Sequence, residues 1–299
     1  MNRITLIVVG LLVAIHPVSA GDDAAKKTIA YVQKLQTDSG GFRISEPKGD
    51  IKVLPTLRAT SSAIRALKYW EGDLPNKEKC IKFVESCWDA EAGAFADEPK
   101  GKPDVFTTAV GLMAVVELKM PADKYVSAAT KYLDANAKSF EEIRIAVAGF
   151  ETVNQKSAKA ADWMDEVDKL WNKKDGPFDR KGPGMARDLA SVVVTKLRLG
   201  AERRIRDPLV NDLDKGQRQN GGWGKADNEI ASDLETTYRV MRCYHMLKAK
   251  PGNVEGVRSF VAKCRNSDGG YAVAPGQPSS VSGTYFAGIV LHWVRENPK

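Results

Sequence analysis

Two kinds of helical pattern alternate along the chain. In the first kind, apolar residues recur at i, i+3, i+4 and i+7 with Lys, Asp and Glu between them, which predicts a helix with one buried and one solvated face. This pattern covers residues 23–36, 76–88, 122–136, 157–172, 207–219 and 253–264. Asp207 followed by Pro208 marks one of these starts, because a capping side chain with proline in the first turn is a helix-start signal.

The second kind of helix is apolar on nearly all sides and follows each helix of the first kind after a loop. It covers residues 56–70, 105–118, 140–153, 186–199, 233–247 and 282–294, and it is clearest at 105–116. A helix without a polar face is buried on all sides. The alternation therefore predicts an all-α protein, a single-domain (α/α)6 toroid of six helical hairpins. The buried helices form its inner ring and the others surround them.

A short phrase of glycine, one further residue and an aromatic residue recurs in the loops that lead from the first kind of helix to the second. Its copies are Gly40-Gly41-Phe42, Gly93-Ala94-Phe95, Gly176-Pro177-Phe178, Gly221-Gly222-Trp223 and Gly269-Gly270-Tyr271. Repetition at a period of about 45–50 residues is typical of a repeat architecture. We expect the glycine to end the outer helix in a left-handed turn and the aromatic ring to fill the gap between neighbouring hairpins. The repeat after the second copy lacks the phrase, and Phe140 lies about where its aromatic residue is expected.

The first 20 residues have the pattern of a signal peptide. Arg3 supplies a positive start, residues 4–15 are apolar, and Val18-Ser19-Ala20 has the small residues of a cleavage site. The apolar run is shorter than the about 20 residues that span a bilayer. We therefore expect an exported protein, periplasmic or secreted, whose toroid comprises residues 21–299 and contains no transmembrane segment.

The distribution of charge narrows the choice of binding partners. The formal net charge is +7, and the basic residues are interspersed with acidic ones, so the sequence predicts no nucleic-acid-binding stripe.

Cys80 and Cys87 lie about 10 Å apart along one predicted helix, too far for a disulfide. Cys243 and Cys264 lie on successive antiparallel helices, and the sequence leaves open whether they form a disulfide or stay as buried thiols. None of the four has the spacing of a zinc site.

The repeated phrase carries a family resemblance. Gln217-Arg-Gln-Asn-Gly-Gly-Trp223 fits the Gln-x-x-x-Gly-x-Trp repeat of squalene cyclases. The six-hairpin layout resembles the β subunits of protein prenyltransferases, most closely the Rab geranylgeranyltransferase type, and residues 270–286 look like the last repeat of those subunits. The resemblance covers essentially the whole mature chain and implies the toroid fold. It implies less about activity, because this repeat also occurs in toroids with other functions.

The resemblance also identifies where metal chemistry would lie. Protein prenyltransferases hold zinc with an Asp-x-Cys pair and a His on a later inner helix, and the matching positions here are Asp233, Glu235 and Gly283. Only one of three ligands remains, so we expect no zinc and interpret Asp233 as a helix N-cap. Since carboxylates suit Mg²⁺, a magnesium ion at Asp233 and Glu235 stays an alternative.

Other candidate residues come from the same comparison. Class II terpene cyclases protonate an alkene with the middle Asp of an Asp-x-Asp-Asp-Thr motif; Glu235 takes that place here, but the supporting Asp is Thr236. Arg187 matches a family His and is a candidate phosphate ligand, unless it pairs with Asp188 or Asp179. The remaining candidates are aromatic residues of the inner helices that would line an apolar cavity or simply pack in the core: Tyr238, Tyr285 and Phe286.

These observations support three hypotheses about function. The first is an exported toroid without the zinc triad that binds an apolar or isoprenoid-like small molecule, or a polypeptide, in its central cavity. The second is an active prenyltransferase, similar to a geranylgeranyltransferase β subunit, or a terpene cyclase-like enzyme, using Asp233 and Glu235 as catalytic residues. The third is a polysaccharide-active enzyme, since (α/α)6 barrels also host glycosidases and lyases, which need paired carboxylates in a cleft.

Overall fold

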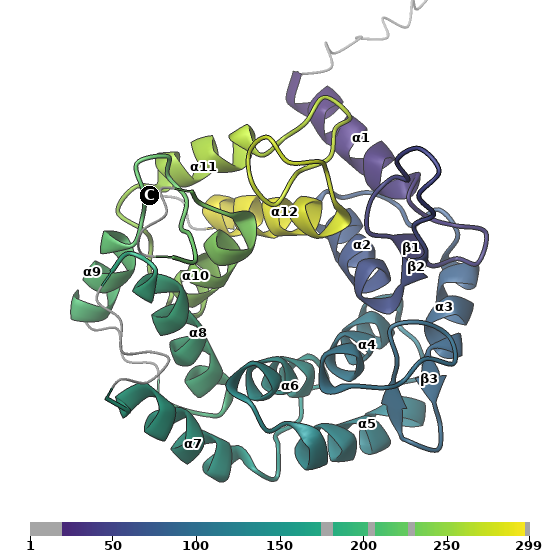
Figure 1. Cartoon of the computed structure of the whole chain (residues 1–299), viewed down its shortest axis with the longest axis horizontal. Coiled ribbons are helices and arrows are strands. Elements are labelled where there is room, and N and C mark those ends of the chain that lie inside the picture. Colours follow the sequence, from purple (N-terminus) through teal and green to yellow (C-terminus); the bar gives the residue numbers. More distant parts are fainter. Residues whose placement is uncertain (1–19, 175–181, 203–206, 227–230, 297–299) are drawn as a thin grey trace, which may run out of the picture.

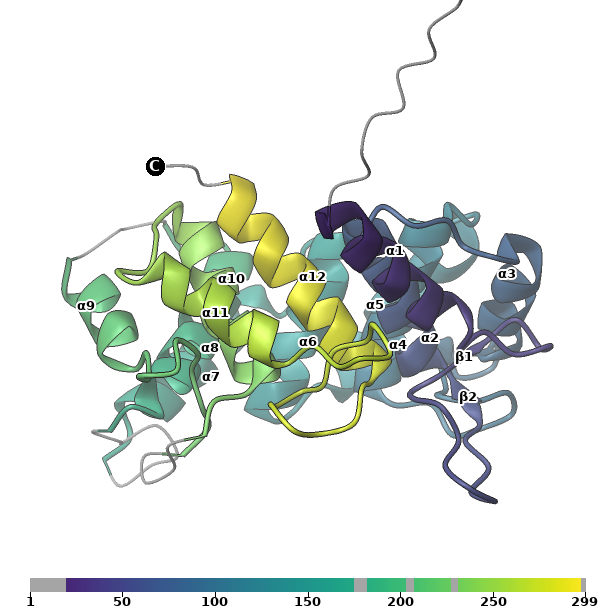
Figure 2. The same cartoon turned by 90° about the horizontal axis from the view of Figure 1, so that it is seen from above.

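The chain forms a closed ring of helical hairpins. The computed structural model describes residues 20–174, 182–202, 207–226 and 231–296. Within these residues, twelve helices form two concentric layers, seen down the ring axis in Figure 1 and from the side in Figure 2. The predicted (α/α)6 toroid is confirmed.

The helices of the inner ring are the nearly all-apolar segments of the sequence. They are α2 (Leu57–Tyr69), α4 (Val105–Leu118), α6 (Phe140–Thr152), α8 (Met185–Arg198), α10 (Leu234–Leu247) and α12 (Val281–Glu296). Each packs against the inner helices before and after it, and α12 packs against α2 to close the ring (Figure 1).

The amphipathic segments form the outer layer. They are α1 (Ala20–Gln33), α3 (Lys77–Ser86), α5 (Asp123–Asn136), α7 (Ala160–Asn172), α9 (Asp207–Lys215) and α11 (Val254–Lys263). Two small antiparallel hairpins also occur in the loops: β1 (Phe42–Arg43) with β2 (Pro55–Thr56), and β3 (Trp88–Asp89) with β4 (Ala94–Phe95).

Several inner helices are fixed at their start by a capping side chain, by a bond to a neighbouring loop, or by both. The side chains of Thr56 and Asp104 accept hydrogen bonds from the backbone in the first turns of α2 and α4. The first N–H of α2, at Leu57, donates to the carbonyl of Asp97 at 2.6 Å in the following hairpin. The first N–H of α12, at Val281, donates to Ile44 at 2.8 Å, so the last repeat is joined to the first in the same way.

The glycine of the repeated phrase lies where one hairpin meets the next. Gly40 and Gly221 have φ values of +89° and +93°, the left-handed conformation predicted from sequence. The expectation that they end the outer helices is wrong, because α1 already ends at Gln33 and α9 at Lys215, and each glycine lies in a turn of the following loop. A Cβ on Gly40 would lie 2.2 Å from the carbonyl oxygen of Lys79 on α3. On Gly221 it would lie 1.9 Å from the carbonyl oxygen of Gly256 on α11. The two backbones therefore approach to a distance that only glycine permits.

In two repeats a glutamine four residues before the glycine of the phrase connects the same two hairpins by hydrogen bonds. The side-chain amide of Gln36 donates to the carbonyl oxygens of Gly40 at 3.0 Å and Asn76 at 3.1 Å. Gln217 repeats this pattern with Gly221 at 2.8 Å and Asn253 at 2.9 Å. Because Asn76 and Asn253 are the N-caps of α3 and α11, one side chain fixes both its own turn and the start of the next outer helix.

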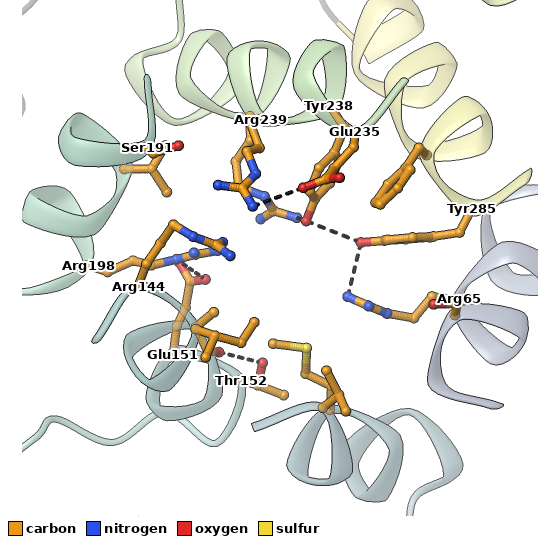
Figure 3. A pocket seen from close by; sticks show the side chains of 18 of the residues that line it. Arg65, Arg144, Glu151, Thr152, Ser191, Arg198, Glu235, Tyr238, Arg239 and Tyr285 are labelled. Carbon is orange, nitrogen blue, oxygen red and sulfur yellow. Dashed lines mark hydrogen bonds and ion pairs between the residues drawn. The ribbon is translucent and has the colours of Figure 1, made fainter. Parts of the chain in front are cut away.

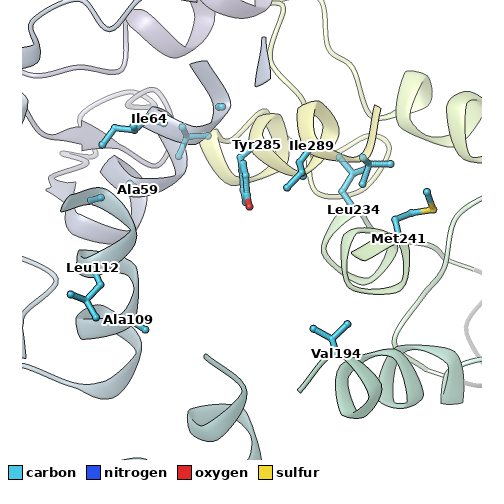
Figure 4. Close-up of a cluster of buried hydrophobic side chains, with 14 of the residues drawn as sticks. Ala59, Ile64, Ala109, Leu112, Val194, Leu234, Met241, Tyr285 and Ile289 are labelled. Atoms are coloured by element: carbon cyan, nitrogen blue, oxygen red, sulfur yellow. The ribbon is translucent and has the colours of Figure 1, made fainter. Parts of the chain in front are cut away.

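The aromatic residue of the phrase is anchored to the inner helix by its backbone as well as by its ring. The N–H groups of Phe42, Phe95, Trp223 and Tyr271 each donate to a threonine hydroxyl of the inner helix that follows, at 2.9–3.1 Å. All four rings are buried. They belong to the hydrophobic core, of which Figure 4 shows a part.

Four further predictions from the sequence can be compared with the structure. The predicted signal peptide up to residue 19 and the third copy of the phrase, at Gly176–Phe178, lie outside the described residues. Phe140 is the first residue of α6 and is partly buried, so it lies in the helix rather than in the loop before it. Among the helices of the described ranges, none combines the length and apolar character needed to cross a membrane.

A substitution at Gly221 tests the backbone contact between hairpins. Gly221→Ala should lower the free energy of unfolding by about 2–5 kcal/mol, because left-handed strain of about 1–2 kcal/mol adds to overpacking of about 1–3 kcal/mol. Gly276→Ala is the matched control, since Gly276 has a φ of +81° but nothing within 4 Å of its added Cβ. Chemical denaturation followed by circular dichroism measures both; equal losses in the two variants would contradict the contact.

Thiol titration tests the state of the cysteines. Cys80, Cys87, Cys243 and Cys264 are free and buried, and burial raises the pKa of each thiol to about 12. Since only the exposed thiolate reacts, a disulfide reagent should find no reactive thiol in the folded protein and four after denaturation. Two thiols after denaturation would instead reveal a bond between Cys243 and Cys264.

Candidate functional site

The inner helices enclose a cavity of about 280 Å³ on the ring axis. Side chains from α2, α4, α6, α8, α10 and α12 line it, and Figure 3 shows them converging from around the ring. On α10 the lining residues are Glu235, Tyr238, Arg239 and Arg242, whose spacing of three and four places them on one face of the helix.

The cavity is rich in arginine. Five arginines line it, against three glutamates: Arg65, Arg144, Arg198, Arg239 and Arg242, with Glu117, Glu151 and Glu235. The expectation of an apolar cavity therefore holds only for part of the wall, where Val110, Met113 and Ile145 lie. The physical reason is that the inner helices have a narrow polar stripe toward the ring axis, which is hidden within their largely apolar sequences.

One group of charges joins α6 to α10. Arg239 donates to Glu141 at 2.9 Å and to Glu235 at 2.9 Å, and Arg144 also pairs with Glu141 at 2.9 Å. Burial raises the pKa of Glu141, but the two guanidinium groups outweigh it and lower that pKa to about 2. Glu141 is therefore ionised at neutral pH, and it neutralises part of the arginine charge.

A second group lies toward the other end of the cavity. Arg198 of α8 pairs with Glu151 of α6 at 2.9 Å. Burial and the nearby charge of Arg242 lower the pKa of Arg198 to about 10, still well above neutrality. Arg198 is thus charged, and Glu151 is its ion-pair partner.

Arg65 and Arg242 differ from these arginines because their partners are phenols. Arg65 donates to the Tyr285 hydroxyl at 3.0 Å, and Arg242 donates to the Tyr238 hydroxyl at 2.8 Å. Within the described part of the chain, neither guanidinium has a carboxylate within ion-pair distance. Two permanent positive charges therefore face the cavity without a carboxylate partner among the described residues.

An aromatic wall lies beside these two cations. The ring of Tyr238 is 4.9 Å from that of Phe286 and 5.8 Å from those of Tyr285 and Trp293. The guanidinium of Arg65 lies 4.2 Å from the ring centre of Tyr285. The wall offers flat apolar surface directly next to positive charge.

Tyr238 is an acid of the cavity whose pKa is strongly lowered. Burial alone would raise its pKa, but the charges of Arg242, Arg65 and Arg198 and the hydrogen bond from Tyr285 lower it to about 7. In Tyr285 burial dominates and raises the pKa. The two phenols are thus driven apart in acidity, which is typical of functional sites.

The candidate residues from the sequence fall into two groups. Tyr238, Tyr285, Phe286 and Glu235 line the cavity together. Asp233 is the N-cap of α10: its carboxylate accepts from the backbone N–H and the hydroxyl of Thr236, both at 2.8 Å. It is not among the residues that line the cavity.

Arg187 lies at the edge of the site rather than within its lining. It approaches Asp188 at 3.5 Å and Glu235 at 3.9 Å. The alternative of an ion pair with Asp188 is therefore seen in the structure, while Asp179 lies outside the described residues.

The positions matched to the zinc ligands of protein prenyltransferases do not fit a zinc ion. Both oxygens of Asp233 are engaged by Thr236, and Glu235 is held by Arg239. At Gly283 a Cβ would lie 2.4 Å from the carbonyl oxygen of Tyr271, so a histidine has no room there. Over the described ranges, no three His, Cys, Asp or Glu side chains are grouped as a metal site would require.

Glu235 is also poorly suited to protonate an alkene. Burial raises its pKa, but Arg239, Lys225 and Arg187 outweigh this and lower it. A carboxylate that is ionised at neutral pH has no proton to donate. The geometry therefore disfavours the terpene cyclase mechanism at this residue.

The arginines of the cavity were missed from the sequence, although a signal for them exists. Arg239 and Arg242 follow Glu235 and Tyr238 at helical spacing, and Arg65, Arg144 and Arg198 lie in three other inner helices. A charge that recurs in helices otherwise apolar on all sides indicates a shared polar face. Such residues are almost never fully buried unless they are paired.

Comparison with solved structures supports the toroid fold. A glycosidase variant has a TM-score of 0.64 at 9% identity, covering 92% of this chain and 97% of that chain. A second glycosidase variant, in complex with glucose, has a TM-score of 0.61 at 9% identity, covering 92% and 97%. A variant of the type II terpene cyclase MstE from Scytonema, in complex with merosterolic acid A, has a TM-score of 0.56 at 8% identity, covering 92% and 96%. At these identities the likeness concerns the fold alone.

Sequence comparison identifies the family. No curated protein matches the chain. The family model described as the prenyltransferase alpha-alpha toroid domain matches residues 6–142 and 122–296. Since these matches together span nearly the whole sequence, the protein belongs to the prenyltransferase alpha-alpha toroid family.

Proposed function

We propose that the protein is a ligand-binding toroid whose central cavity takes a small organic anion with an apolar or aromatic part. The observation that carries this proposal is the pair of guanidinium groups, Arg65 and Arg242, that face the cavity without a carboxylate partner in the described residues. A carboxylate or phosphate would supply the missing charge, and arginine binds both with paired hydrogen bonds.

The aromatic wall accounts for the apolar part of the ligand. Tyr238, Tyr285 and Phe286 lie directly beside the two cations, so an anion bound there would pack its carbon skeleton against their rings. A cavity of about 280 Å³ suits a small molecule rather than a folded polypeptide. The terpene cyclase of similar fold was solved with merosterolic acid A, an acid, which agrees with this class of ligand.

We also propose that the protein acts after export. The support is the leader pattern of residues 1–20, with Arg3, an apolar run and the small residues before Gly21. An exported toroid would bind a ligand found outside the cytoplasm.

Matched ligands test the anion site. Geranyl phosphate and geraniol share a carbon skeleton, and calorimetry should find the phosphate bound at least about 10-fold more tightly, since a charged hydrogen bond contributes roughly 1.5–3 kcal/mol. Arg65→Gln and Arg242→Gln should each remove most of this preference. Arg58→Gln is the control, because Arg58 pairs with Asp97 at the rim, outside the cavity lining. Equal binding of the two ligands would contradict the proposal.

N-terminal sequencing tests export. Expressed with its leader in a secretion-competent bacterial host, the protein should be recovered outside the cytoplasm with Gly21 as its first residue. A form lacking residues 1–20 should remain in the cytoplasm. If the form expressed with its leader is instead recovered from the cytoplasm with residue 1 intact, the proposal is contradicted.

A further inference from the structure

Four side chains form a continuous hydrogen-bonded chain along one side of the cavity. Arg65 donates to Tyr285 at 3.0 Å, Tyr285 donates to Tyr238 at 3.5 Å, and Arg242 donates to Tyr238 at 2.8 Å. The chain crosses α2, α12 and α10, and Figure 3 shows three of its members, Arg65, Tyr285 and Tyr238, beside the open space of the pocket.

The direction of each of these hydrogen bonds depends on which group carries a proton to donate. A guanidinium can only donate, so each phenol oxygen must accept from its arginine. Tyr285 then uses its own proton to donate to Tyr238. In this arrangement the Tyr238 oxygen receives two hydrogen bonds and, within the described residues, donates none.

This arrangement matches a phenolate better than a phenol. With Tyr238 ionised, every donor of the chain has an acceptor, and the negative charge lies next to a guanidinium that lacks a carboxylate. With Tyr238 neutral, either its own proton or that of Tyr285 has no acceptor within this group of four side chains and points into the cavity. The internal geometry therefore favours a site that holds a negative oxygen and is open to a bound molecule.

We propose that Tyr238 is a catalytic general base that removes an acidic proton from a molecule bound in the central cavity. The substrate class is a neutral organic molecule with an acidic proton. Arg65 and Arg242 are the cations that stabilise the anion left when this proton is removed. The inference rests on the proposed function, because the anion formed is the kind of species that the cavity is proposed to bind.

The other charged and titratable groups around Tyr238 favour its ionised form. Arg65 and Tyr69 face it from α2, Arg144 and Glu151 from α6, Arg198 from α8 and Tyr285 from α12. The only carboxylate in this set, Glu151, is paired with Arg198 at 2.9 Å. Positive charge therefore predominates, and the pKa of Tyr238 is lowered to about 7 although burial acts in the opposite direction.

The first measurement needs no ligand. Absorbance of tyrosinate near 295 nm, followed against pH, should show one tyrosine ionising near pH 7 and the others only at about pH 10 or above. Tyr238→Phe should abolish the early step, and Tyr69→Phe should leave it. Arg242→Gln, which keeps the tyrosine, should move the step toward higher pH. Absence of any early step in the wild-type protein would overturn the proposal.

The second measurement tests proton abstraction with a general carbon acid, 5-nitrobenzisoxazole. Tyr238 takes the proton on C3 as the C–H bond breaks; the electron pair completes a nitrile, the N–O bond breaks, and the oxygen leaves as a phenolate facing Arg65 and Arg242. No other reactant is needed. The expected rate is on the order of 10²-fold above buffer, as for other general bases, and it should rise with pH through about 7.

The variants separate this inference from the proposed function. Tyr238→Phe should lose the elimination but keep the ring and still bind geranyl phosphate, while Tyr132→Phe, on α5 and outside the cavity lining, should retain both. Elimination no faster in the wild-type protein than in Tyr238→Phe would overturn the role of Tyr238 and leave the anion site standing. Tyrosinate ionisation without any binding of geranyl phosphate would instead count against the proposed function.

Discussion

The ring depends on a contact between two backbones that no side chain can enter. At each described copy of the phrase, a left-handed glycine lies against the outer helix of the next hairpin, and at Gly221 the space for a Cβ is occupied by the carbonyl of Gly256. This approach sets the distance between hairpins and therefore the angle between successive repeats. The glutamine bridge and the threonine that accepts the aromatic N–H then fix the two helices on either side. Repeats joined in this way share one core, so their stabilities are coupled to those of their neighbours.

The same constraint creates the functional space. Six inner helices held at a fixed spacing leave an axial cavity, and only residues on their narrow inward stripes can reach it. Charges that are distant in sequence meet there, as Arg239 and Glu141 do at 2.9 Å. Most of these charges are neutralised in pairs, which ties α6 to α8 and α10. Arg65 and Arg242 are different, since their phenol partners carry no full charge unless ionised. The cavity therefore combines a rigid, neutralised part with a part that has spare positive charge.

Most of the fold follows from sequence because periodicity and turn chemistry are local properties. The segment 105–118, apolar on nearly all sides, is α4 with the same limits, and Asp233 is an N-cap as interpreted. The start of α1 at Ala20 was missed because this residue was assigned to the predicted leader. The site could be predicted only in part. Tyr238, Tyr285 and Phe286 were identified as aromatic residues of inner helices. Arg242 lies one turn after Tyr238 on α10, but Arg65 comes from α2, and only ring closure brings it to these side chains.

Closure itself involves the two ends of the described chain. Gly269 of the last phrase lies against Lys27 of α1, and the hydroxyl of Thr28 donates to the Gly269 carbonyl at 2.8 Å. The earliest helix thus docks onto the latest loop. During synthesis, α1 emerges long before its docking partner exists, so the growing polypeptide remains an open arc until its final hairpin has been made. The order of assembly therefore postpones completion of the circle to the very end.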